Sequence, residues 1–279
     1  MTGSFALLLW AWIETARNMG RLRLWSPFLL YFLIQAGAVL LLTRFHEPIL
    51  APVLVPVVRA IAGEPALHYP LFYLALPSVF SRLSLGLDLI FGAWLIGAAF
   101  LYFRQADRPT ERVGGSLATA TRAWPRLILL RLPVILLLYG SIYLLPQLVF
   151  GRPEEVGGNT VRLIRYGSFL VGVILEALFL YAPIVLLVER RGILAALGRS
   201  LRIFGRLPGI TLAVVLVPNL VQLPISFVLR HAETIVRRLS PEMVAWALVL
   251  AAGAYLVATF FIVGAGARLY RVETEGFEG

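Results

Sequence analysis

The sequence predicts an all-α membrane protein, a polytopic bundle of about six transmembrane helices that forms a single membrane domain over residues 1–279. Hydrophobic residues make up 59% of the chain and charged residues only 14%, whereas soluble domains carry about 25% charged residues. The mean hydropathy is +0.85. A soluble fold has no means of burying that much apolar surface, and the apolar segments are separated by short polar loops.

Six apolar stretches have the length of a membrane span. A hydrocarbon core of about 30 Å requires a helix of roughly 20 apolar residues. Several of the stretches contain proline, which predicts kinks that neighbouring helices can accommodate in a membrane. The predicted spans are Trp25–Thr43, Leu83–Phe103, Leu127–Phe150, Leu163–Val188, Leu207–Leu229 and Met243–Ala267.

The connection between the first two spans contains two shorter apolar pieces, Ile49–Ile61 and Ala66–Phe80. The first piece includes Pro52, Pro56 and Arg59, and as a helix it would reach only about 20 Å, which is too short to cross a bilayer. We therefore expect both pieces to be interfacial or re-entrant.

The basic residues predict the orientation of the spans. All 25 of them are arginine, and cytoplasmic loops of membrane proteins carry an excess of arginine and lysine. With both termini inside, sixteen arginines lie in cytoplasmic segments and nine on the other side. The sequence therefore predicts a multi-pass protein of the bacterial cytoplasmic membrane, with both termini in the cytoplasm.

Three arginine-bearing cytoplasmic segments, one before each predicted hairpin of two spans, share a pattern. The segment from Gly115 to Arg122 matches the segment from Gly192 to Arg199 at four of eight positions. A second match, Arg-x-x-x-Arg-Leu, begins at Arg17, at Arg122 and at Arg202. The two alignments differ by three residues, so the register of a repeat stays open at this point.

Each of these segments is interpreted as an amphipathic helix that lies in the headgroup layer. Arginines three or four residues apart share one face of a helix, and Leu194, Leu197, Leu201 and Phe204 cover another face of the third segment. Such helices point their arginines toward lipid phosphates. They serve either as recognition elements for anionic lipid or a partner protein, or only as elbows that anchor the next hairpin. The candidate contacts are Arg17, Arg21, Arg122, Arg126, Arg199, Arg202 and Arg206.

The third of these segments also carries a resemblance to known proteins. The stretch Ala182–Glu189 reads Ala-Pro-Ile-Val-Leu-Leu-Val-Glu and is followed by Gly192, Ala195-Ala196, Arg199-Ser200 and Phe204. It resembles a large group of bacterial six-span proteins, among them the membrane domain attached to some glycerophosphodiester phosphodiesterases. The resemblance implies a six-span architecture. The soluble phosphodiesterase barrel is absent here, so the resemblance implies no catalysis.

Four polar residues are predicted to lie deep within spans. Glu176 is near the middle of the fourth span, where an uncompensated carboxylate costs about 2.5 to 3.5 kcal/mol. Asn219 and Gln222 share a face of the fifth span, and Gln35 is at mid-depth in the first. These residues either line a midplane polar site of the kind found in transporters or form hydrogen bonds between helices that contribute on the order of 1 kcal/mol each.

No catalytic, cofactor or metal signature accompanies these features. The chain has no cysteine and no lysine, which excludes thiolate chemistry, Schiff bases and phosphate-binding loops of the Walker type. The predicted function is a non-enzymatic scaffold or accessory subunit that binds lipid or a partner protein, with a second copy of the chain as one option. The alternative is a small transporter around Glu176. An enzyme acting on lipid is the third class, and nucleic acid is not an expected partner.

Overall fold

The computed structural model describes residues 2–107, 115–144 and 158–276. These residues form helices and turns, and none of them lies in a strand, which confirms the all-α class. They divide into two compact units. The first comprises Met1–Trp25, Ala93–Val217 and Phe261–Gly279, and the second comprises Ser26–Gly92 and Pro218–Phe260. Each unit is described by itself below.

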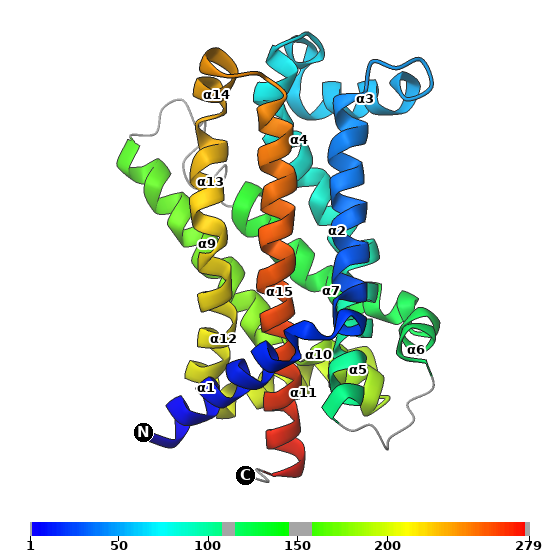
Figure 1. Cartoon of the computed structure of the whole chain (residues 1–279), viewed down its shortest axis with the longest axis vertical. Coiled ribbons are helices and arrows are strands. Elements are labelled where there is room, and N and C mark those ends of the chain that lie inside the picture. The colour runs from blue at the N-terminus through cyan, green and yellow to red at the C-terminus, as the bar shows by residue number, and fades with distance from the viewer. Residues whose placement is uncertain (1, 108–114, 145–157, 277–279) are drawn as a thin grey trace. The chain divides into compact units, whose positions relative to one another are not determined.

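Figure 1 shows the helices in chain order, from blue at the N-terminus to red at the C-terminus. Short 3-10 or π segments join some of the α-helices. The α-helices are α1 (Thr2–Arg17), α2 (Leu22–Thr43), α3 (Ala51–Ala62), α4 (Leu71–Leu87), α5 (Ala93–Asp107), α6 (Ser116–Arg122), α7 (Trp124–Tyr139), α9 (Gly158–Phe179), α10 (Ala182–Val188), α11 (Ile193–Arg206), α12 (Pro208–Leu220), α13 (Gln222–Arg230), α14 (Ala232–Arg238) and α15 (Met243–Glu275).

Four helical segments in the described part of the chain are long and apolar enough to cross a membrane. They are Leu22–Thr43, Leu71–Asp107, Tyr166–Val188 and Met243–Glu275. Each coincides with one of the predicted spans, and together they are consistent with a multi-pass membrane protein.

The second of these segments begins at Leu71 rather than at the predicted Leu83. It runs through α4, a π turn at Asp88–Gly92, and α5. Part of the piece that was expected to be interfacial is therefore the start of this helix. Arg82 lies within this helix, and its Nη1 donates a hydrogen bond to the carbonyl oxygen of Ile61 at 3.4 Å.

Two predicted spans are not found as single helices. The span at 127–150 corresponds to α7 and a π turn at Gly140–Leu144, and the rest of it lies outside the described residues. The span at 207–229 is divided at Val221 into α12 and α13. The division has a local cause, because Pro224 has no N–H to donate to the carbonyl of Leu220 and its ring crowds that carbonyl.

Helices α11 and α12 form a pair that is bent by 99°, and counting this pair as one span would give a fifth. The six spans and their arrangement as three hairpins therefore stay a prediction.

The second unit has its own hydrophobic core. Phe45 and Phe72 stack with ring centroids 4.4 Å apart, and Phe28 meets Phe260 edge to face at 5.5 Å. Val58 of α3 is fully buried in the same core. The short helix α3 is thus held by apolar packing against α4, although it is too short to span a bilayer.

Candidate functional site

Helices α1, α6 and α11 of the first unit each bury a pair of small residues spaced four apart. Residues four apart lie on one face of a helix, so each helix packs one narrow face against a neighbour and leaves the rest of its surface open. The pairs are Ala11 and Thr15, Ser116 and Ala120, and Ala196 and Ser200, none of them more than 1% exposed.

Two arginines follow each buried pair at the same spacing. The first is two residues after the second small residue, at Arg17, Arg122 and Arg202. The second comes four residues later, at Arg21, Arg126 and Arg206, and all six arginines are exposed.

The burial pattern decides the register that the sequence left open. The alignment that pairs Arg122 with Arg202 also superimposes the buried faces of α6 and α11. The other alignment pairs exposed Arg122 with half-buried Arg199. The three segments therefore share the spacing of the buried pair and the two exposed arginines, although the second arginine lies within the same helix only in α11.

Each small face packs against a different helix. The Ser200 hydroxyl of α11 donates to the carbonyl oxygen of Leu178 in α9 at 2.8 Å. The Ser116 hydroxyl of α6 donates to Oε1 of Gln105 in α5 at 3.3 Å. Thr15 of α1 faces α15, at the other end of the chain, and Figure 1 shows α1 crossing the C-terminal part of α15.

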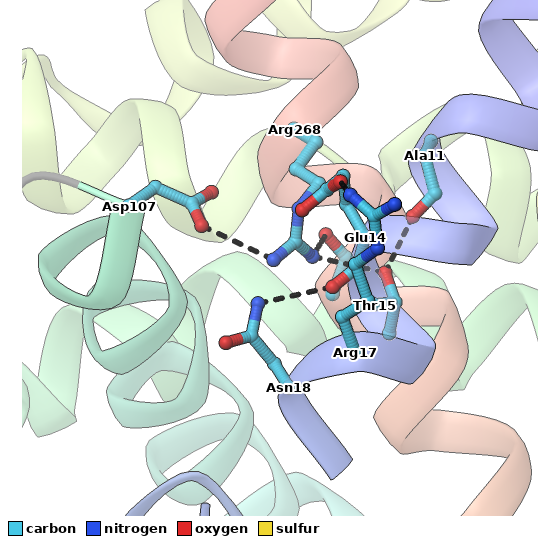
Figure 2. A network of polar contacts seen from close by, with 8 residues as sticks. Ala11, Glu14, Thr15, Arg17, Asn18, Asp107 and Arg268 are labelled. Carbon is cyan, nitrogen blue, oxygen red and sulfur yellow. Dashed lines mark hydrogen bonds and ion pairs between the residues drawn. The ribbon is translucent and has the colours of Figure 1, made fainter.

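Figure 2 shows the polar network that joins α1 to α15. Arg268 is 1% exposed, and its Nη1 donates to Oγ1 of Thr15 at 2.9 Å and to the carbonyl oxygen of Gly264 at 3.1 Å. Its Nη2 donates to Oδ1 of Asp107 at 3.1 Å. The guanidinium also lies 5.6 Å from the centroid of the Phe103 ring. One buried arginine thus connects α1, α5 and α15.

The close approach of α1 to α15 depends on Gly264. A Cβ atom at this position would lie 2.6 Å from Cγ2 of Thr15 and 3.0 Å from the ring of Phe103. Small residues permit such approaches between membrane helices. Thr15 also donates to the carbonyl oxygen of Ala11 at 2.7 Å, which fixes its hydroxyl as an acceptor for Arg268.

Two of the residues that carry the resemblance, Glu189 and Arg199, meet directly after α10. The Tyr270 hydroxyl donates to Oε1 of Glu189 at 2.9 Å, and Nε of Arg191 lies 2.6 Å from its Oε2. Nε of Arg199 lies 3.7 Å from Oε1. Arg199 was predicted as a lipid or partner contact, but its side chain is only 19% exposed and faces this internal carboxylate.

Helix α11 presents two open faces beside its buried one. Leu194 is 84% exposed and Leu201 42% exposed, and both lie on an apolar face. Arg202 lies on a separate exposed face. Helix α11 is therefore amphipathic, with separate buried, apolar and basic faces.

The remaining candidate arginines differ in their partners. Arg17 pairs with Glu14, and Arg206 pairs with Glu273. The other four side chains form no hydrogen bond or ion pair within the described residues, and these are Arg21, Arg122, Arg126 and Arg202.

The predicted midplane residues fall in both units. In the second unit Gln222 donates from Nε2 to Oδ1 of Asn219 at 2.6 Å, and Gln35 is buried in α2. Glu176 is half-buried in α9 of the first unit. The structure therefore brings Asn219 and Gln222 together, as a shared helix face predicts.

A buried carboxylate in the second unit was not recognised from the sequence. Asp88 falls near the start of the predicted span Leu83–Phe103, but it is 8% exposed at the π turn within Leu71–Asp107. The Tyr31 hydroxyl donates to its Oδ1 at 3.4 Å. Gly92 makes room for this carboxylate, because a Cβ atom there would lie 2.3 Å from Oδ1. π turns inside helices are frequent at functional sites.

Metal binding has no geometric support in this part of the molecule. Within residues 2–107, 115–144 and 158–276, no three His, Asp or Glu side chains gather closely enough to hold a metal ion.

The chain was compared with models of protein families, with curated proteins and with solved structures. None of the three comparisons finds a match. The resemblance to the membrane domain of glycerophosphodiester phosphodiesterases therefore stays a prediction from the residues around Glu189.

Proposed function

We propose that the chain is a non-enzymatic integral membrane protein, a scaffold or accessory subunit, that binds the anionic headgroups of its own bilayer through α1, α6 and α11. The observation that supports this proposal is the repeated pattern of a buried small pair followed by two exposed arginines. An elbow that only anchors a span requires the buried face. It does not require exposed arginines two and six residues after the buried pair in all three segments.

The strength of the proposed lipid binding can be stated as a free energy per arginine. A basic residue near an anionic membrane surface contributes about 1 kcal/mol of binding free energy. Leu194 and Leu201 on the apolar face of α11 add hydrophobic anchoring beside Arg202. In the proposed topology the three helices lie on the cytoplasmic side of a bacterial inner membrane, each before one of three hairpins, with both termini inside.

The experiment removes arginines whose side chains have no partner among the described residues. Purified protein is titrated with nanodiscs or mixed micelles that contain phosphatidylglycerol or, separately, phosphatidylcholine. Replacing Arg122, Arg126 and Arg202 with glutamine should weaken the preference for phosphatidylglycerol roughly 100-fold, from three contributions of about 1 kcal/mol.

The matched control removes three exposed arginines of the second unit that already pair with glutamates, namely Arg44, Arg59 and Arg237. This control should keep the preference of the unmodified protein. If the two triple variants lose the preference for phosphatidylglycerol equally, only the total charge of the protein matters. If neither variant loses it, the three helices serve only as elbows that anchor the spans.

A second candidate function, a small transporter, is favoured by one specific observation. Asp88 is a carboxylate buried within a span at a π turn, next to Tyr31, and buried ionisable residues in spans mark ion or substrate pathways by default. The midplane candidates Glu176, Asn219, Gln222 and Gln35 belong to the same proposal. Uptake or proton-flux measurements in proteoliposomes test it directly.

A further inference from the structure

A groove in the first unit separates α1 from the junction of α11 and α12. Phe5 and Leu8 line it from α1, and Arg206–Ile210 lines it from the junction. Its volume is about 330 Å³, and pockets that hold small molecules occupy about 300 to 1,000 Å³. The groove is therefore large enough for part of a ligand.

The side chains that line this groove are apolar except for one. Leu8 and Ile210 are buried, and Phe5 is 64% exposed. The one charged residue of the lining is Arg206, which pairs with Glu273. A guanidinium has five N–H donors in a planar fork, so a single carboxylate leaves donors for a second anion. The groove thus combines an apolar cleft with a cationic rim.

The position of the groove at the junction of α11 and α12 indicates what kind of ligand it would hold. Helix α11 is amphipathic with exposed leucines and arginines, and the apolar helix α12 leaves it at 99°. In the proposed topology the groove lies at the corner between α11 in the headgroup layer and α12 in the hydrocarbon. At that depth a phospholipid changes from phosphate to acyl chain.

We propose that this groove binds one anionic phospholipid, with an acyl chain along Phe5, Leu8 and Ile210 and the phosphate on Arg206. The proposal rests on the proposed function, because it assumes that α1 and α11 face the headgroup layer. It goes further in assigning a discrete site for one lipid, in addition to the diffuse attraction of exposed arginines.

Gly209 offers a direct test because it lines the groove without filling it. A Cβ atom at Gly209 would meet nothing within 4 Å, and the same is true at Gly198 on α11, which does not line the groove. Gly209→Leu therefore places a side chain in the groove without a clash at its Cβ. Gly198→Leu is the matched control, with the same chemical change on an exposed helix surface.

The measurement is native mass spectrometry of the detergent-purified protein after exchange with phosphatidylglycerol and phosphatidylcholine of identical acyl chains. Gly209→Leu should lose one tightly retained lipid, and Gly198→Leu should keep it. Arg206→Gln should keep the lipid but lower the preference for phosphatidylglycerol about fivefold, the contribution of one arginine at an anionic surface. Phe5→Asp, at an exposed position in the groove lining, should also reduce lipid retention. This variant replaces Gly209→Leu in the experiment if Gly209→Leu does not fold.

Equal lipid retention in Gly209→Leu and Gly198→Leu, whether high or low, would overturn the groove assignment. The same variants also distinguish the groove proposal from the proposed function. If the variant with Arg122, Arg126 and Arg202 replaced by glutamine is unchanged while Gly209→Leu loses its lipid, the proposed function fails and the groove stands.

Discussion

Arg268 donates a hydrogen bond from Nη1 to Oγ1 of Thr15 across a separation of 253 residues. The same guanidinium pairs with Asp107 at 3.1 Å. Helix α1 is therefore held on the C-terminal part of α15. The arginine serves as a structural connector, whereas the arginines of the three-helix pattern are open to their surroundings.

Replacing Arg268 with methionine should destabilise the first unit strongly. The substitution leaves Asp107 without its charge partner and Thr15 without a donor, and breaking a buried ion pair on one side costs about 3 to 5 kcal/mol. Arg271→Met is the control, since Arg271 stacks over Trp10 at 5.9 Å but is only half-buried. Thermal unfolding in detergent should show a large decrease in melting temperature for Arg268→Met and a small decrease for Arg271→Met. A similarly small decrease in both variants would contradict a connecting role for Arg268.

Gly264→Ala should separate α1 from α15 without any change in charge. The added Cβ would lie 2.6 Å from Cγ2 of Thr15, whereas at Gly253 the nearest atom, Cε2 of Phe32, is at an ordinary 3.7 Å. Overpacking of this kind costs typically about 1 to 3 kcal/mol. Limited proteolysis after Arg17 and Arg21 should accelerate in Gly264→Ala and stay unchanged in Gly253→Ala. Equal proteolysis rates would show that α1 does not rely on this contact.

Hydrophobic length was sufficient to predict the long helices from the sequence. Two of these helices are long apolar segments with polar residues at their ends, namely Leu22–Thr43 and Met243–Glu275. The break at Val221 also has a local signal in Pro224, because a proline removes the hydrogen bond to the residue four before it. The sequence interpretation treated this proline as a kink, but the structure has two helices there.

The candidate site was less predictable because its signal is burial of ordinary residues. Ala, Ser and Thr at positions such as Ala120 and Ser200 look alike whether they face a helix or water, so the register of the repeat required the structure. Arg268 is one of the sixteen arginines assigned to cytoplasmic segments, and no local pattern distinguishes it from half-buried Arg271 or reveals its pairing with distant Asp107. Asp88 was misplaced for a related reason, since its helix begins at Leu71 rather than at Leu83.

The proposed orientation can be tested with single cysteines, because the chain contains none of its own. Gly198→Cys on α11 should be protected from an impermeant thiol reagent in intact cells and should label after the membrane is opened. Ile49→Cys, at a position that is 89% exposed between α2 and α3, should label from outside. The reverse pattern would place the arginine-bearing helices on the outer surface and refute the cytoplasmic assignment.

The last prediction separates a scaffold from a transporter through the two carboxylates within spans. A transport role requires Glu176 or Asp88 to exchange a proton or contact a substrate during a cycle. The isosteric changes Glu176→Gln and Asp88→Asn keep the shape and an oxygen acceptor while removing the titratable proton. If the protein is a scaffold, both variants should keep lipid binding and nearly the same melting temperature. If Glu176 forms a hydrogen bond between helices, Glu176→Leu should lower the melting temperature, because removing one member of the pair strands the other. Asp88→Leu should do the same by removing the acceptor of Tyr31.

Carbodiimide modification gives an independent readout, since a carboxylate that reaches water reacts and a packed one is protected. Rapid modification of either residue, together with loss of flux in its isosteric variant, would favour the transporter over the scaffold.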